Sequence, residues 1–464
     1  MAPHRLARGT GTYRPDVIRP HPRAGPGVRA AFVRRASLRW WRSAAVPALL
    51  LLAAAGCTSS STAGSEPSTI AAGSPWVGAF ASVIPPAPVN SLTAVDCPTE
   101  TSCWAVGSTV GGAGVPNGAA VIATTNGGAK WSSEVIPPAA GHLSDISCSD
   151  QRDCVAVGQA ALSSNGQGVI IATVDGGRFW QSRPLPPGFL DITAVWCRSD
   201  HRCTAVGDVA GGAAALSSAS ATSAWVQQGM LPAGVSGATD VSCPDDAHCW
   251  ATARRSPDPD HVAGVVALTV DGGSTWSVLS TPTGLGYLDG ISCLSSGGGN
   301  TALTATTSRP TAARVGTTAT PPGVSAPSGA APTAPTAPTP AGVAGADCTL
   351  VGTTSTTLDT TRNGRGVILT TGNGGGSWSS RPVAASSASL MGVSCTGIDA
   401  CVMVGSSVST SVRAGSVFLT GPTGNPWRSM AEVDAPQPLT GVSCVSQSRC
   451  VVVGESITQH LVGG

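Results

Sequence analysis

The fifteen cysteines of this 464-residue chain follow a repeating pattern. Cys57 stands alone after an apolar stretch, and the other fourteen cysteines form pairs. Six pairs enclose five residues each and a seventh is interrupted by an insertion; the pairs are Cys97/Cys103, Cys148/Cys154, Cys197/Cys203, Cys243/Cys249, Cys293/Cys348, Cys395/Cys401 and Cys444/Cys450. Seven copies of one small element predict a repeat protein, in which each copy is a supersecondary unit.

The spacing of the pairs gives the size of the unit. Successive first cysteines lie 51, 49, 46, 50, 102 and 49 residues apart, and the long step contains the insertion. A period near 49 is typical of propellers, solenoids and domain arrays. One unit contains four short β-prone segments, at 143–148, 154–158, 168–173 and 180–185, separated by Gly, Asn, Asp and Pro. This pattern favours a four-stranded antiparallel blade.

The ends of the repeat region decide between a ring and an open array. Residues 76–85 match the fourth strand of a unit, and residues 444–464 supply two strands and a poor third. Joined together, the two ends complete one blade and remove the exposed sheet edges of an open array. We therefore predict an all-β fold over residues 76–464, a seven-bladed β-propeller of four-stranded antiparallel blades closed by an N-terminal strand.

A second motif lies between the third and fourth strands. It contains Asn-Gly-Gly or Asp-Gly-Gly and ends in tryptophan at Thr124–Trp131, Thr173–Trp180, Thr269–Trp276 and Thr371–Trp378. Asn-Gly and Asp-Gly are strong hairpin signals because both residues tolerate positive φ. The motif resembles the Asp-box, the bacterial neuraminidase repeat of sialidase-like propellers, and the resemblance implies that its side chains bond the turn backbone while the tryptophan packs between blades. The Gly-rich repeats also resemble the propellers of photosystem II assembly factors.

The N-terminal region has the composition of an export signal. Basic residues precede an apolar run at 44–55, and Gly56-Cys57 follows. Leu-Leu-Ala-Ala-Ala-Gly-Cys resembles a bacterial lipobox, which implies a signal peptide at 1–57 and a lipid on Cys57. An ordinary secretory signal with a free thiol at Cys57 is the alternative, and Arg34-Arg35 leaves the twin-arginine route open beside the general one. Residues 58–75, rich in Ser, Thr and Ala, are expected to form a flexible tether.

The cysteine pairs are expected to be disulfides, one cysteine ending the first strand of a blade and the other starting the second. Facing residues of antiparallel strands lie within disulfide range. Zinc sites need four convergent ligands, which these separate pairs lack, so we expect no metal and no cofactor. Disulfides agree with export to the outer face of a bacterial cytoplasmic membrane. Residues 297–346, a Thr/Ala/Pro-rich insertion, are predicted to be disordered.

Propeller topology predicts where a partner binds. The cysteine hairpins and the Asp-box-like turns share one face, and the more variable loops at 108–117, 254–261, 353–365 and 406–413 lie on the other. Variable loops on a rigid scaffold commonly carry recognition. The candidate binding residues on this face are Arg254, Arg255, Asp258, Asp260, His261, Arg362, Arg365 and Arg413.

The residue inventory favours a non-catalytic role. A net charge of +1 produces no field that would attract nucleic acid. The sialidase-like resemblance implies an arginine triad and a tyrosine nucleophile, yet the chain has two tyrosines, of which only Tyr287, near Asp289, lies outside the signal. We expect a monomeric, lipid-anchored protein that binds or scaffolds an unidentified envelope protein or glycan. A sialidase-like glycoside hydrolase is the alternative, and a purely structural envelope component is a third.

Overall fold

The computed structural model describes residues 68–69, 79–111, 118–161, 167–258, 260–295, 346–356, 364–381, 383, 387–397, 400–409, 412–419, 428–429, 437–454 and 457–462. Its described secondary structure consists of β-strands that form seven antiparallel sheets, and no described helix is long and apolar enough to cross a membrane. The all-β prediction is confirmed. The signal segment, most of the tether, and nearly all of the insertion lie outside the described residues.

The first four sheets follow the chain in order. Their strands are β3 (Val89–Asp96), β4 (Cys103–Thr109), β5 (Gly118–Thr124) and β6 (Ser132–Ser133); β7 (Ala140–Cys148), β8 (Cys154–Ala160), β9 (Gly168–Thr173) and β10 (Gln181–Ser182); β11 (Phe189–Cys197), β12 (Cys203–Val209), β13 (Gly212–Ser218) and β14 (Val226–Met230); and β15 (Ser236–Ser242), β16 (Cys249–Asp258), β17 (His261–Thr269) and β18 (Ser277–Leu279).

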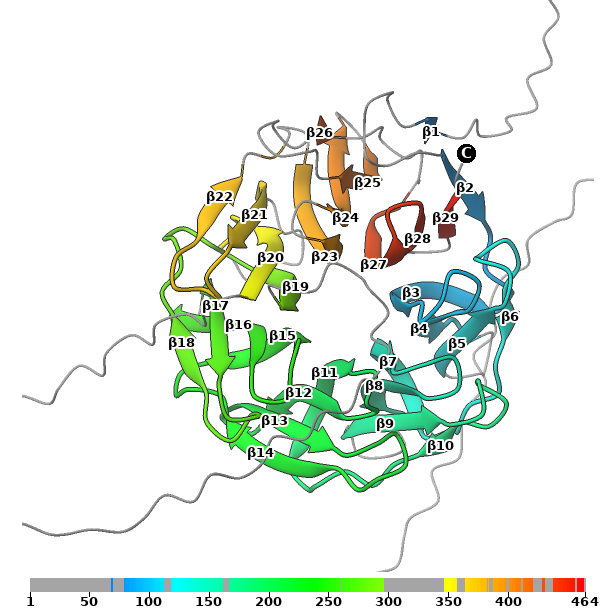
Figure 1. Ribbon diagram of the computed structural model, residues 1–464, viewed down its shortest axis with the longest axis horizontal. Helices are drawn as coiled ribbons and strands as arrows, with labels where there is room; N and C mark the ends of the chain where they lie inside the picture. Colours follow the sequence, from blue (N-terminus) through cyan, green and yellow to red (C-terminus); the bar gives the residue numbers. More distant parts are fainter. Residues whose placement is uncertain are drawn as a thin grey trace, which may run out of the picture. The chain divides into compact units, whose positions relative to one another are not determined.

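The last three sheets continue the repeat. They contain β19 (Leu288–Ser295), β20 (Ala346–Thr353), β21 (Gly366–Thr371) and β22 (Ser379–Arg381); β23 (Ser387–Gly397), β24 (Ala400–Ser409), β25 (Val412–Leu419) and β26 (Arg428–Ser429); and β27 (Leu439–Ser446), β28 (Arg449–Gly454) and β29 (Ile457–Val462), joined by β2 (Ala79–Val83) and β1 (Ser68–Thr69). Within the compact unit Ala63–Gly464, the sheets are arranged around a common centre with the first strand of each innermost (Figure 1).

The seventh sheet is shared by the two ends of the repeat region. Strand β2 pairs with β29 in antiparallel register, Ala79 opposite Val462. Strand β1 then pairs with β2, so the segment 58–75, expected to be only a tether, contributes two residues to the sheet. The innermost strands of the last and first sheets also meet, where Thr440 Oγ1 donates to the Leu92 carbonyl at 2.7 Å.

The apolar core lies between neighbouring sheets. One cluster joins the second and third sheets through Val157, Ile170 and Leu216, all with no exposed surface. Another cluster joins the seventh sheet to the first, where Val453 lies with Leu92. Short Val, Ile and Ala side chains suit this arrangement because each four-stranded sheet is covered on both of its faces.

Seven disulfides tie the first strand of each sheet to the second, with Cα atoms 3.9 to 4.1 Å apart. Every pairing predicted from the sequence is present, namely Cys97–Cys103, Cys148–Cys154, Cys197–Cys203, Cys243–Cys249, Cys395–Cys401, Cys444–Cys450 and, across the insertion, Cys293–Cys348. The disulfides indicate an oxidising environment outside the cytosol.

The position of the cysteines within their strands corrects one expectation. In the second and third sheets the two cysteines end the first strand and start the second, as expected. In the seventh sheet this prediction is wrong, because Cys450 is the second residue of β28 and Cys444 does not end β27. A register shift after Cys444 lets the ladder continue past the cystine, so that Ser446 pairs with Arg449. The fifth and sixth sheets also continue past their cystines.

Candidate binding surface

The four Asp-box-like turns share one hydrogen-bond pattern. In the second sheet, Thr173 Oγ1 donates to Asp175 Oδ1 at 2.8 Å and accepts from Gly177 N at 3.0 Å, while Phe179 N donates to Asp175 Oδ1. Both glycines of this turn have positive φ, 77° and 88°. The same bonds hold the turns at Asn126, Asp271 and Asn373. These side chains are engaged with their own backbone, so the turns have a structural role.

The residue before the first cysteine of each unit makes a contact that was not predicted from the sequence. In six units it is Ser or Asp, and its oxygen accepts a hydrogen bond of 2.7 to 3.2 Å from the backbone N–H of the first cysteine in the next sheet. The acceptors are Asp96, Ser147, Ser242, Ser292, Ser394 and Ser443. The signal was visible, since Ser-Cys or Asp-Cys recurs in six of seven units.

The exception lies between the third and fourth sheets. Trp196 occupies the equivalent position, and an indole has no acceptor for the Cys243 N–H. Here the two cysteine hairpins are joined by charge: Arg198 and Arg202 both contact Asp246 Oδ1, the second at 3.2 Å. A cavity of about 250 Å³ lies beside these residues. The arginines are therefore used to join two blades.

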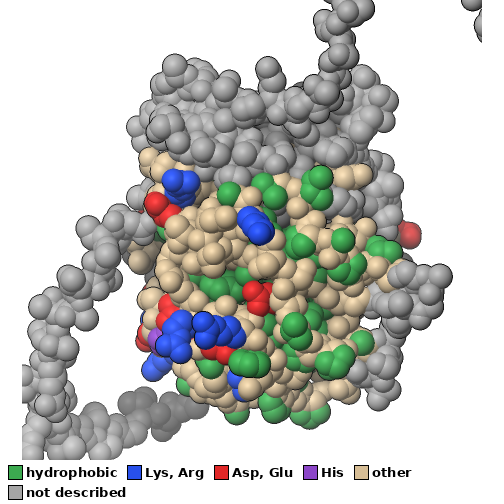
Figure 2. Space-filling model, turned by 90° about the vertical axis from the view of Figure 1, so that its right-hand side faces the viewer, with side chains coloured by type: hydrophobic (Ala, Val, Ile, Leu, Met, Phe, Trp, Pro, Cys, Tyr) green, Lys and Arg blue, Asp and Glu red, His purple; other side chains and the backbone are tan. Residues whose placement is uncertain are grey.

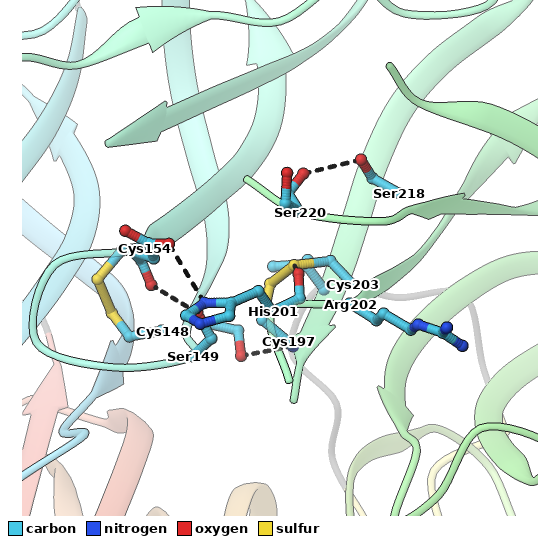
Figure 3. Close-up of a disulfide and its surroundings, with 12 residues drawn as sticks. Cys148, Ser149, Cys154, Cys197, His201, Arg202, Cys203, Ser218 and Ser220 are labelled. Atoms are coloured by element: carbon cyan, nitrogen blue, oxygen red, sulfur yellow. Dashed lines mark hydrogen bonds and ion pairs between the residues drawn. A yellow bond between two sulfur atoms is a disulfide. The ribbon is translucent and has the colours of Figure 1, made fainter. Parts of the chain in front are cut away.

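Ser149, Asp153 and His201 meet between the second and third sheets, beside two disulfides (Figure 3). Ser149 Oγ lies 3.0 Å and Asp153 Oδ2 lies 3.2 Å from the same ring nitrogen, His201 Nδ1. A Ser-His-Asp triad needs the serine and the aspartate on different nitrogens, so this arrangement is not a triad. With Asp150, the carboxylates and the imidazole bring ligand atoms within 4.8 Å of one another and could hold a metal ion.

The centre of the ring is acidic. Asp145, Asp240 and Asp289 line a cavity of about 140 Å³ together with threonines and glycines, and no basic side chain lines it. Asp240 Oδ2 accepts from Ile291 N of the next sheet at 2.7 Å. Burial, opposed by the hydrogen bonds from Ile291 and Val241, raises the pKa of Asp240 to about 7.

The ends of the blades opposite the disulfides carry those candidate residues that the structure describes. The loop expected at 254–261 is instead a β-hairpin, because Arg254 pairs with Gly264 and Asp258 with His261. A register shift between Arg255 and Asp258 admits Pro257, whose missing N–H costs no ladder bond there. The loop expected at 406–413 is likewise a tight hairpin, in which Ser409 pairs with Val412.

One basic residue of the first hairpin, Arg254, is engaged by an acid of the neighbouring sheet. Arg254 and Arg255 are half-buried, and Arg254 lies close to Asp208 of the third sheet. Burial raises the pKa of Asp208, and the Arg254 charge opposes that rise. Asp191, opposite Asp208 in the ladder, has its pKa raised to about 6 by burial and by the Asp208 carboxylate.

The hairpin tip is the accessible part of this surface. Asp260 and His261 are exposed, and Val262 N donates at 2.7 Å to the carbonyl of Thr356, which follows β20 in the fifth blade. Arg365 is also exposed, and its N–H donates to Thr354 Oγ1. The structure thus joins the fourth-blade hairpin to the segment that follows β20 in the fifth blade. Arg362 lies outside the described residues, and nothing is described of the side chains of Asp258 and Arg413.

Charge is sparse on the described surface. A side view shows mostly uncharged side chains, with the largest group of Lys and Arg beside Asp and Glu at lower left and isolated basic side chains above it (Figure 2). Several large apolar side chains are exposed near strand ends, including Val110, Leu190 and Met230, each about half exposed. This surface is suited to contacts that combine apolar and hydrogen-bonding groups.

No protein-family model and no curated protein matches the chain. Solved structures do. The structure described as YCF48 bound to D1 peptide is 12% identical, with a TM-score of 0.52 over 86% of this chain and 98% of its own. The GH74 xyloglucanase from Xanthomonas campestris is 10% identical, with a TM-score of 0.51 over 82% of this chain and 53% of its own, about half its length. At these identities the matches show the propeller fold alone.

Proposed function

We propose that this chain is an exported, lipid-anchored propeller that binds a polypeptide partner, without catalysing a reaction, on the face opposite the disulfides. The observation that carries the proposal is the bond between the fourth-blade hairpin and the segment after β20, beside which Asp260, His261 and Arg365 are exposed. A similar propeller has been solved with a peptide bound, which supports this class of partner.

The described residues give little support to the hydrolase alternative. Tyr287 is 6% exposed and does not line the central cavity, and that cavity has no arginine on its wall. A retaining sialidase needs an accessible nucleophile and basic groups for the substrate carboxylate. Cleavage of a sialoside reporter that is lost in Tyr287→Phe would establish the hydrolase instead.

Site-specific photo-crosslinking in intact cells tests the binding face. A crosslinker placed at His261 or Arg365 should capture a partner that protease digestion removes from the adduct. The matched controls are Lys130 and Arg178, both exposed on the Asp-box-like turns of the disulfide face. Equal capture from both faces, or adducts that only a glycosidase removes, would contradict the proposal.

The lipid anchor gives this face a direction. The chain enters β2 from the disulfide face, so a lipid at Cys57 would hold that face toward the membrane. Lys130 is the only lysine in the chain and reports on the disulfide face. An amine-reactive probe that cannot cross membranes should label Lys130 less in intact cells than in detergent, while protease reaches the His261 hairpin in both. Shielding of the His261 hairpin in intact cells would refute this orientation.

A further inference from the structure

Every disulfide of this protein joins two cysteines that are neighbours in the sequence. Six pairs are separated by six positions, and the seventh, Cys293–Cys348, by 55 with no cysteine between them. A chain that is exported N-terminus first, and oxidised as it emerges, therefore needs only to join each cysteine to the next one.

Loop-closure entropy favours the same pairing in a chain that is already complete. Cys103 lies six positions from Cys97 but 45 from Cys148. If the closure probability falls as the −3/2 power of loop length, the short loop is favoured roughly 20-fold. The six short pairs then close first, and Cys293 and Cys348 are the two thiols left between residues 97 and 464.

Burial makes correct pairing before folding necessary. Cys103, Cys154 and Cys401 are at most 1% exposed in the folded protein, so a catalyst of disulfide exchange cannot reach them once the blades have formed. A wrong pair would also place the first and second strands of a blade out of register, since partner cysteines such as Cys444 and Cys450 lie directly opposite each other in the ladder.

We propose that this protein acquires its disulfides from a thiol–disulfide oxidase alone, with no need for an isomerase. A chain thiolate attacks the oxidase disulfide, forms a mixed disulfide and releases one oxidase thiol. The second chain thiolate then attacks the chain sulfur of that bond, forms the cystine and releases the other oxidase thiol. Each cystine costs the chain two electrons and two protons, and the oxidase disulfide becomes a dithiol.

Cys57 is the one thiol that would disturb this sequence of reactions. It precedes Cys97 by 40 positions, and as a free thiol it would compete with Cys293 for Cys348 or join two chains. This step rests on the proposed lipidation, which converts the Cys57 thiol into a thioether and leaves an even number of thiols.

The test exports the full chain in bacterial hosts that lack either the oxidase or the isomerase, and maps disulfides in unreduced digests by mass spectrometry. Loss of the isomerase should leave the yield of the seven consecutive pairs within about two-fold, and loss of the oxidase should lower it about ten-fold or more. Non-consecutive pairs in the host without isomerase, or a yield below about one-fifth there, would overturn the proposal.

Two variants separate the pairing rule from the lipid. Cys57→Ser keeps the number of thiols even and should form all seven pairs without isomerase. Cys97→Ser leaves Cys103 as a spare thiol. This variant should form disulfides from Cys103 to Cys293 or Cys348, and these disulfides should be less abundant in a host that has the isomerase. If Cys57 carries no lipid but Cys57→Ser pairs correctly, only the proposed anchor fails. If Cys57→Ser mispairs without isomerase, the pairing rule fails.

Discussion

In six of the seven units, the residue before the first cysteine joins two blades with one hydrogen bond. Because the cysteine N–H points away from its own ladder, it would be buried without a partner if the neighbouring side chain were apolar. An unpaired buried donor costs about 1 to 3 kcal/mol, more than a satisfied hydrogen bond contributes. The Ser-Cys and Asp-Cys steps are thus explained by what the next blade requires.

Ser147→Ala should lower the free energy of unfolding by about 1 to 2 kcal/mol, because it leaves the Cys197 N–H without its 2.8 Å bond. Urea denaturation of the oxidised protein measures the change. Ser182→Ala is the matched control, since Ser182 is exposed on the outer strand β10. Equal effects of the two substitutions would show that the inter-blade bond does not stabilise the fold.

Three partly buried acids predict how stability depends on pH. Burial first, and then the Asp175 charge, raises the pKa of Glu134 to about 7, and Asp240 and Asp191 titrate near 7 and 6. The unfolded chain releases these protons near pH 4, so the folded protein holds more protons between about pH 4 and 7. The melting temperature should therefore fall as the pH rises from 5 to 8.

Asp240→Ala should flatten this pH dependence, because it removes an acid whose pKa is raised to about 7. Ala or Gly occupies the equivalent position in five other blades, so the fold accepts a small side chain there. Asp271→Asn should leave it unchanged, since hydrogen bonds from Thr275 lower the Asp271 pKa below its ordinary value. Scanning calorimetry at several pH values measures both. A wild-type melting temperature that rises from pH 5 to 8 would contradict the assignment.

At the scale of elements, the repeated turns show natural substitutions at the same position. Asp175 and Asp271 hold two turns, whereas Asn126 and Asn373 make the same bonds with an amide oxygen. The turn therefore needs one acceptor of the right length and not a charge. Strand lengths vary more than the turns do, as the ten-residue β16 shows beside the seven-residue β12.

Asp271→Ala should cost about 1 kcal/mol of unfolding free energy, because the Thr275 N–H and the Thr269 hydroxyl both lose their acceptor. Asp271→Asn should retain most of the unfolding free energy that Asp271→Ala loses. Thermal denaturation of the two variants side by side gives the comparison. If the Asn variant is as unstable as the Ala variant, the bonds at Asn126 and Asn373 are not equivalent to those at Asp271.

At the scale of the whole molecule, the two ends meet in one sheet. Removing residues 1–84 would leave β29 as an unpaired edge, which is a site for association with other chains. We expect this truncation to lower the melting temperature and to produce dimers or aggregates in size-exclusion chromatography. A chain that begins at residue 63 keeps β1 and β2 and should stay monomeric. A monomeric truncation of unchanged stability would show that β2 is dispensable.

The sequence predicted the sheets well because the cysteine period and the Asn-Gly-Gly or Asp-Gly-Gly turns are local signals. It failed at 254–261, which was predicted to be a loop but forms a hairpin in which a register shift accommodates Pro257. It also placed Cys450 at the start of its strand, although the ladder runs one pair further. The inter-blade acceptors and the meeting of Ser149 with His201, 52 positions apart, were missed. Such contacts depend on how neighbouring blades face each other, which spacing within one unit does not encode.

The central claim is that this is an exported ring in which Cys57 carries a lipid and the other fourteen cysteines are paired consecutively. A mass map of unreduced peptides from the protein isolated from its native cells tests it most directly. The account predicts seven cystine peptides, each joining sequence neighbours, and an N-terminal peptide that begins at Cys57 and carries a diacylglycerol thioether. A Cys57 found as a free thiol or in a disulfide, or any non-consecutive cystine, would contradict it.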